Sequence, residues 1–149
     1  MTQPQTMALQ GVANVVVRGL LRVPLLARIV GGRLIVLYPV GCRSGKRYTI
    51  PVAYTRHDDA LLIGSPFAWG RNLRTGEPLE VRFKGRRRVA DVEVIADEAG
   101  VTQHYAVIAR DNRAFANFNK ISVVDGTPDP AALHRAWVGG ARVFVLRLR

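Results

Sequence analysis

The pattern of apolar and polar positions predicts a chain built mainly from β-strands. Short runs that are rich in β-branched and aromatic residues, or that alternate between apolar and polar residues, are typical of strands. Such runs predict strands over residues 33–38, 48–56, 60–64, 80–83, 89–95 and 142–148. Pro51 lies inside the second run, and proline within a strand favours a sheet edge or a bulge.

The segments between these strands are mostly short turns. His57-Asp58-Asp59 separates one pair of strands, and a basic turn over residues 84–88 separates another. Parallel strands need long crossover connections, whereas antiparallel strands can be joined by tight turns. The hairpins therefore argue against a doubly wound parallel sheet. They predict a mainly β (α+β) fold, a small antiparallel barrel with helices outside it.

Helices are expected at three places, with a short helical turn within residues 65–76. They cover residues 7–21, 97–110 and 131–137. Pro24 limits the first helix, and the acidic pair Asp97-Glu98 suits the positive N-terminal end of the second. We expect residues 1–24 to form a helical segment that packs on one barrel domain, residues 25–149.

Charge is distributed unevenly along the 149 residues, whose net charge is +11. No acidic residue precedes Asp58, whereas eight basic residues do. Such a positive field attracts anions. Nucleic acid, an anionic membrane surface, and a phosphorylated or carboxylated small molecule are the candidate partners.

Cys42 is the single cysteine, which excludes an internal disulfide and a cysteine-rich zinc site. The three histidines lack metal-ligand spacing, so we expect no metal. A cytoplasmic location is compatible with this composition. Arginines interrupt the apolar N-terminal region, so it lacks the roughly 20 apolar residues of a membrane span. The N-terminal helix could instead pack on its own domain or rest on a membrane surface.

A loop over residues 41–48 combines glycine, hydroxyl and positive charge. Gly41 and Gly45 allow the backbone to turn and to direct N–H groups toward one point, and such concave runs bind anions. Ser44 adds a hydroxyl donor, and Arg43 and Lys46 add charge, as does Arg47. The loop is not a phosphate-binding Walker motif, because its spacing is one residue short and Ser or Thr does not follow the lysine. A solvated basic turn is the alternative interpretation.

A second cluster follows at residues 65–76. Trp69 and Asn72 are three residues apart and would share one face of a helical turn. An indole can stack on a flat ring, and an amide can hydrogen-bond its edge. The alternative is that Trp69 belongs to the core and that Asn72 is a cap.

Together the two clusters resemble the deazaflavin-dependent nitroreductase and quinone reductase family. The resemblance covers residues ~30–95, including the hairpin that connects the clusters. The matching residues are Gly41-x-Arg43-Ser44-Gly45-Lys46-x-x-Thr49-x-Pro51, then Gly64-Ser65, then Trp69-x-x-Asn72-Leu73-Arg74-x-Gly76.

The resemblance implies a split β-barrel that binds coenzyme F-420, an 8-hydroxy-5-deazaflavin with an anionic tail. It implies that the first cluster holds the phosphate region, through Arg43, Ser44, Gly45, Lys46, Arg47 and Tyr48. It implies that the second cluster lines the deazaflavin, through Gly64, Ser65, Trp69, Asn72 and Leu73. The implied reaction transfers a hydride from the reduced coenzyme to a small organic acceptor, such as a quinone, an enone or a nitro compound.

The chain departs from the family pattern at several positions. Cys42 replaces one of two basic residues, Tyr48 stands where many members have arginine, and Ala53 where some have a substrate-facing tyrosine. The glycine-rich loop before Trp69 is shortened to residues 66–68. These changes retain cofactor binding and weigh against nitroimidazole-type substrates.

Several alternatives stay open at this point. FMN is the alternative cofactor, and a basic module that binds nucleic acid or membrane is the alternative to an enzyme. No nucleic acid partner is expected, because the sequence lacks a recognition helix and a ladder of aromatic residues among the basic ones. The catalytic residue is not identified; Tyr48, Tyr54 and Ser65 are candidate proton donors. Related barrels include monomers and dimers, so a homodimer also stays open.

Overall fold

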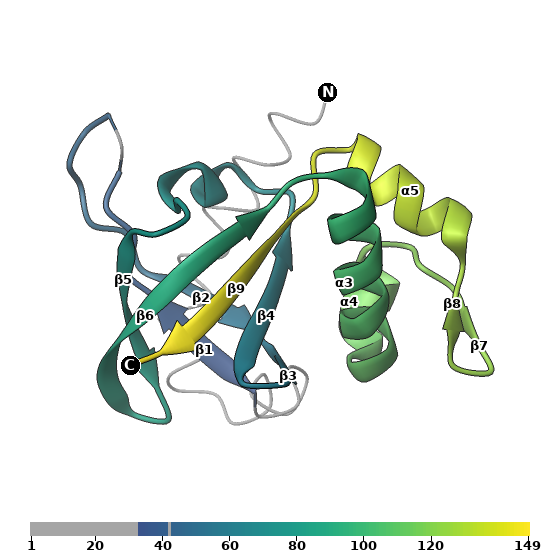
Figure 1. Cartoon of the computed structure of the whole chain (residues 1–149), viewed down its shortest axis with the longest axis horizontal. Helices are drawn as coiled ribbons and strands as arrows, with labels where there is room; N and C mark the ends of the chain where they lie inside the picture. Colours follow the sequence, from purple (N-terminus) through teal and green to yellow (C-terminus); the bar gives the residue numbers. More distant parts are fainter. Residues whose placement is uncertain (1–32, 42) are drawn as a thin grey trace.

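The computed structural model describes residues 33–41 and 43–149 (Figure 1). Most of the chain it describes forms an antiparallel sheet and the helices beside it. The strands of the sheet are β1 (Leu34–Leu37), β2 (Ile50–Ala53), β3 (Thr55–His57), β4 (Ala60–Ser65), β5 (Pro78–Phe83), β6 (Arg86–Ile95) and β9 (Arg142–Leu148). The predicted N-terminal helix over residues 7–21, and the boundary near residue 24, lie outside the described residues.

The sheet nearly closes on itself into a split β-barrel. Its strand order is β2-β1-β5-β6-β9-β4-β3, so β2 and β3 occupy the two edges. These two strands are consecutive in the chain and only Tyr54 separates them. The Tyr54 N–H donates to the Arg33 carbonyl at 3.2 Å, next to the start of β1. The single predicted strand over residues 48–56 is therefore a bent segment that connects both edges.

The position of Pro51 agrees with the edge that its sequence context predicts. Within the sheet, β2 pairs with β1 alone, with Pro51 opposite Val36. Proline lacks an N–H group and cannot donate to a ladder, so an edge strand tolerates it.

Two hydrophobic cores lie on the two faces of this sheet. The core inside the barrel includes Ile35, Leu37, Ile63, Val81, Val92, Phe144 and Leu146. Along β9 the alternate residues Val143 and Val145 point to the other face and pack under the helices. Each fully buried side chain of this size stabilises the fold by about 1.5–3 kcal/mol. The alternation in residues 142–148 thus serves two cores.

The helices α3 (Glu98–Asp111), α4 (Arg113–Phe118) and α5 (Pro130–Val138) lie together on one side of the barrel (Figure 1). A short 3₁₀ helix, η1 (Ala68–Asn72), follows β4. The Asp97 carboxylate accepts the Gly100 N–H at 2.9 Å and caps α3. Pro130 occupies the first turn of α5, where its missing N–H has no cost. Among the described residues, no helix is long and apolar enough to span a membrane.

The structure differs from the sequence-based prediction at two connections. The turn between β5 and β6 is limited to Lys84-Gly85, both with positive φ, whereas Arg86 already belongs to β6. A small hairpin for which no strand was predicted precedes α5, formed by β7 (Val123–Val124) and β8 (Thr127–Pro128). Helix α4 was not predicted.

Candidate functional site

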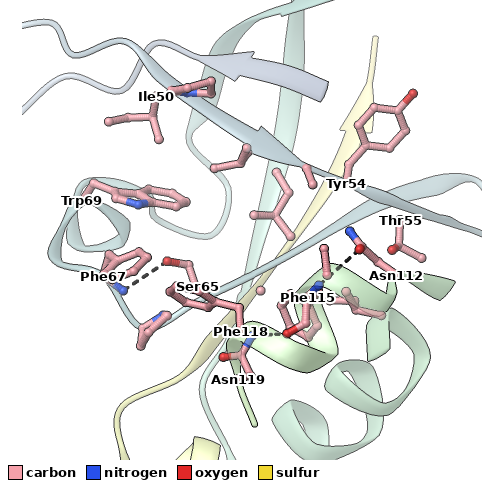
Figure 2. A pocket seen from close by; sticks show the side chains of 18 of the residues that line it. Ile50, Tyr54, Thr55, Ser65, Phe67, Trp69, Asn112, Phe115, Phe118 and Asn119 are labelled. Carbon is pink, nitrogen blue, oxygen red and sulfur yellow. Dashed lines mark hydrogen bonds between the residues drawn. The ribbon is translucent and has the colours of Figure 1, made fainter. Parts of the chain in front are cut away.

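A cavity of about 560 Å³ lies at the bent edge of the barrel (Figure 2). One wall comes from residues 48 and 50–55 of the bent segment. A second wall comes from residues 63–69 and 72, and a third from α4 with the end of α3. The fold therefore brings three separate parts of the sequence to one place.

The lining of this cavity is uncharged and mostly apolar. None of the described residues that line it is Asp, Glu, Lys, Arg or His. Aromatic rings come from Phe67, Trp69, Phe115 and Phe118, and hydroxyl or amide groups come from Tyr48, Tyr54, Thr55, Ser65, Asn72, Asn112 and Asn119. Ligand pockets with this character bind flat apolar groups and orient them through a few polar contacts.

Five of the predicted cofactor-binding residues line this cavity: Tyr48, Gly64, Ser65, Trp69 and Asn72. A neighbouring cavity of about 400 Å³ is lined by residues that include Arg47, Leu73 and Arg74. Asn72 lines both cavities, so they lie side by side. The other predicted site residues, Arg43, Ser44, Gly45 and Lys46, line neither of these cavities.

The backbone of the loop over residues 41–48 differs from the expected cluster of N–H groups. The Gly41 N–H donates to the Lys46 carbonyl at 2.7 Å, and the Gly45 N–H donates to the Gly41 carbonyl at 3.0 Å. The Lys46 N–H donates to Ser44 Oγ at 3.2 Å. These three N–H groups are hydrogen-bonded within the loop, because the loop closes as a tight hairpin. The N–H groups of Gly41, Gly45 and Lys46 are therefore not free to bind an anion.

Arg43 and Lys46 supply such side chains. Both are exposed, and within residues 33–41 and 43–149 neither has an ion-pair partner. Tyr48 ends the loop at the mouth of the 560 Å³ cavity. The loop thus presents two exposed cations close in sequence to Tyr48, which lines the uncharged cavity.

Arg47 is engaged by other residues of the barrel. It forms an ion pair with Glu80, and its guanidinium lies over the Tyr38 ring at 5.0 Å. Arg87 contacts the same two residues, at 2.8 Å from Glu80 Oε1 and 5.2 Å from the Tyr38 ring. Arg47 therefore anchors the end of the loop to the sheet.

Trp69 belongs to the core and also reaches the cavity. Its side chain is 8% exposed and packs on Phe144, with ring centroids 5.4 Å apart. A Cβ at Gly70 would lie 2.5 Å from the Phe144 ring, so η1 approaches the barrel as closely as a glycine allows. Asn72 does not cap η1, whose cap positions are Phe67 and Leu73. The core interpretation of Trp69 is therefore compatible with a face that lines the cavity.

Gly64 permits the close approach of two helices. A Cβ at this position would lie 2.7 Å from Tyr105 Cε1 and 2.9 Å from Phe115 Cζ. Real Cβ contacts are longer, so any larger residue would displace α3 or α4. In this structure, helix packing accounts for the glycine.

The three candidate proton donors lie in different surroundings. Ser65 is buried, and its Oγ accepts the Phe67 N–H at 3.1 Å (Figure 2). Tyr54 packs edge-on against Phe83 at 5.4 Å, and Figure 2 shows its hydroxyl directed away from Ser65. Tyr48 is exposed at the mouth. Ser65 is thus the candidate whose hydroxyl lies at the wall of the cavity.

Helix α4 contributes side chains that the sequence did not reveal as site residues. Asn112 Oδ1 accepts the Phe115 N–H at 3.2 Å, which caps α4. Asn119 Nδ2 donates to the Phe115 carbonyl at 2.9 Å. Phe118 is 58% exposed and meets Phe67 edge-on at 6.1 Å across the cavity (Figure 2). The one available signal was Asn112 itself, a favoured N-cap residue after the end of a predicted helix.

A cluster around Asp111 fastens the junction of α3 and α4 to the barrel. Asp111 ends α3 and forms an ion pair with Arg33, beside β1. The Thr55 hydroxyl, buried in β3, donates to Asp111 Oδ2 at 2.8 Å. Thr55 and Asn112 both line the cavity, so these contacts set the position of α4 relative to the bent strand. Among the described residues, no cluster of His, Cys, Asp and Glu could hold a metal ion.

Comparison with known proteins is limited to solved structures, because no protein-family model and no curated protein matches the sequence. A protein of unknown function from Agrobacterium tumefaciens is 18% identical with a TM-score of 0.50, over 78% of this chain and 48% of that one. This chain therefore spans about half the length of that protein.

Two further structures are less similar. A candidate 5-nitroimidazole antibiotic resistance protein from Bacteroides thetaiotaomicron is 12% identical, with a TM-score of 0.45 over 80% of this chain and 75% of that one. An FAD-binding protein from Mesorhizobium loti is 14% identical, with a TM-score of 0.44 over 81% and 84%. At these levels of identity, the comparisons concern the fold alone.

Proposed function

We propose that this chain is an oxidoreductase that transfers a hydride from reduced coenzyme F-420 to a small organic acceptor. The observation that carries the proposal is the uncharged cavity in which Tyr48, Ser65, Trp69 and Asn72 meet. These residues come from the two sequence clusters that resemble the deazaflavin-dependent family. They lie together only because the barrel closes.

The residues present fit the two parts of the coenzyme. The cavity of about 560 Å³, with aromatic walls and few polar groups, suits a flat uncharged ring. The exposed cations Arg43 and Lys46 suit an anionic tail, and Tyr48 lies between loop and cavity. When bound, the reduced coenzyme would supply the hydride.

The protein would contribute binding, orientation and exclusion of water. Ser65 would donate a hydrogen bond at the cavity wall, where its hydroxyl is already oriented by the Phe67 N–H. The acceptor would lie against α4, where Phe118 exposes an aromatic face. An uncharged lining disfavours charged acceptors, because a charge buried without a partner is costly. We therefore propose neutral, flat acceptors such as quinones and enones.

Turnover with an acceptor panel tests this function. Reduced coenzyme is mixed with the protein and with quinones, enones or nitroaromatics, and its oxidation is followed by absorbance. Phe118→Ala should raise KM for a neutral quinone by about tenfold, since the side chain supplies roughly 1–2 kcal/mol of contact. The stability of the Phe118→Ala protein should change little, because the Phe118 side chain is exposed. The exposed Val138, which lines none of the cavities described here, provides the matched control Val138→Ala.

The outcomes of this panel separate the alternatives. Oxidation of the reduced coenzyme by no acceptor would contradict the proposal. A protein that is yellow as purified and binds FMN in preference to the deazaflavin would favour the alternative cofactor. If Phe118→Ala and Val138→Ala have equal KM values, the acceptor does not lie against α4.

A further inference from the structure

A groove distinct from both cavities described above lies on the opposite side of α4 from the 560 Å³ cavity. Its volume is about 660 Å³, and it lies between the ends of α3 and α4 and strand β7. The α4 residues Phe115 and Phe118 line the first cavity, whereas Arg113 and Ala116 line this groove. Helix α4 therefore separates this groove from the 560 Å³ cavity.

The rim of this groove is basic. Arg110 from α3, Arg113 from α4 and Lys120 after α4 all line it, and all three are exposed. None of the described lining residues is acidic, and none of these three cations pairs with a described carboxylate. Several unpaired cations around one hollow create a local positive potential that attracts an anion.

The floor of the groove is apolar. Ala109, Ala116 and Ile121 are each 3% exposed and belong to the core beneath the helices. Val123 and the exposed Val124 extend this apolar surface along β7. The groove therefore offers charge at its rim and apolar contact along β7, with a closely packed base beneath.

Lys120 occupies a backbone conformation that favours glycine. Its φ is +57°, and the Lys120 N–H donates to the Asn117 carbonyl at 3.1 Å. The Ile121 N–H donates to the Ala116 carbonyl at 2.8 Å, which completes a Schellman motif at the end of α4. Glycine would meet this geometry without strain. A lysine at this position retains a charge beside the groove at the expense of local stability.

We propose that this groove binds an amphipathic anion, a phosphate or carboxylate group attached to an apolar chain. Arg110, Arg113 and Lys120 bind the anionic group through charge-assisted hydrogen bonds. The chain lies along the apolar surface of Val123 and Val124, above the buried floor. The site is independent of the coenzyme cavity on the other side of α4.

Calorimetric titration with hexyl phosphate and with inorganic phosphate tests the site. Hexyl phosphate should bind at least about tenfold more tightly, because its chain is removed from water. Arg110→Gln/Arg113→Gln should weaken hexyl phosphate binding by at least about tenfold. The control Arg56→Gln/Arg142→Gln removes the same charge from two exposed arginines outside the groove and should bind as the unmodified protein does.

Lys120→Gly separates binding from folding. This variant should raise Tm by about 3 °C, because glycine relieves the positive φ, while hexyl phosphate binds several-fold more weakly. Vesicles of phosphatidylglycerol, compared with vesicles of phosphatidylcholine, distinguish the source of the anion. Binding to the former indicates a lipid, and binding to hexyl phosphate alone indicates a soluble metabolite.

Three results would overturn the proposal. The first is equal affinity of the unmodified protein and the groove variants for hexyl phosphate. The second is an equal loss of affinity in the control, which would indicate a general charge effect. The third is an equal affinity for hexyl phosphate and inorganic phosphate, which would remove the apolar component.

Discussion

Gly64 shows how a single residue near the cavity is constrained by packing. Gly64→Ala places a Cβ within 3 Å of the Tyr105 and Phe115 rings, so it should destabilise the protein by about 1–3 kcal/mol. Gly139→Ala is the matched control, because its Cβ would meet its nearest atom at 3.4 Å, an ordinary contact. Urea unfolding measures both. If the two variants have the same free energy of unfolding, Gly64 does not pack closely against Tyr105 and Phe115.

The buried hydroxyl of Tyr105 is a second residue-scale feature. It has no hydrogen-bond partner among the described residues, and burial raises the pKa of this phenol. Tyr105→Phe should therefore leave the stability at pH 7 unchanged or raise it by up to about 1 kcal/mol. A protein typically loses stability when a buried tyrosine is changed to phenylalanine, because the tyrosine hydroxyl is usually hydrogen-bonded.

The pH dependence of Tyr105 has a definite sign. In the unfolded chain a tyrosine loses its proton near pH 10, whereas the folded protein retains it to higher pH. Above about pH 10 the folded state therefore binds more protons, and stability falls by up to 1.4 kcal/mol per pH unit, roughly. Tyr105→Phe should show a smaller fall in urea titrations between pH 9 and about 11. Identical profiles would contradict this account.

At the scale of elements, the sequence predicted the strands well and α4 not at all. The predicted strand at residues 142–148 coincides with β9, because its successive apolar side chains point in turn to the two hydrophobic cores. Helix α4 has six residues, too few for a helical period to appear. The basic residues 86–88 resembled a turn because charge is common in loops. They belong to β6, whose exposed positions tolerate it.

The contact between Asp111 and Thr55 joins two of these elements. Asp111→Ala should destabilise the protein by about 1–2 kcal/mol, because the buried Thr55 hydroxyl loses its acceptor. Asp111→Ala and Thr55→Val together should cost less than the sum of the single changes, with a coupling of about 0.5–1.5 kcal/mol.

A second cycle provides the control for this coupling. Thr102 lies in α3, and its hydroxyl donates to the Glu98 carbonyl, away from Asp111. Thr102→Val should add to Asp111→Ala without coupling. If the Asp111 and Thr55 changes are equally additive, the cluster does not fasten the junction of α3 and α4 to the barrel.

At the scale of the whole molecule, closure of the barrel determines the site. The sequence indicated Tyr48, Gly64, Ser65, Trp69 and Asn72, and these residues line one cavity. It did not indicate the wall formed by α4, because the resemblance ends near residue 95 and single residues such as Phe118 have no local signature. Closure also explains why the bent segment and the residues around η1 form walls of the same cavity.

The central claim is that this cavity and its neighbouring loop bind coenzyme F-420. Titration of the oxidised coenzyme, followed by fluorescence anisotropy, tests it most directly. Binding in the micromolar range is expected, about −8 kcal/mol. Arg43→Ala/Lys46→Ala should weaken it by at least about tenfold, since each cation is exposed and available to the anionic tail. The control Arg56→Ala/Arg142→Ala should leave it unchanged. Absence of binding at millimolar protein, or equal affinity in the loop variant and the control, would contradict the account.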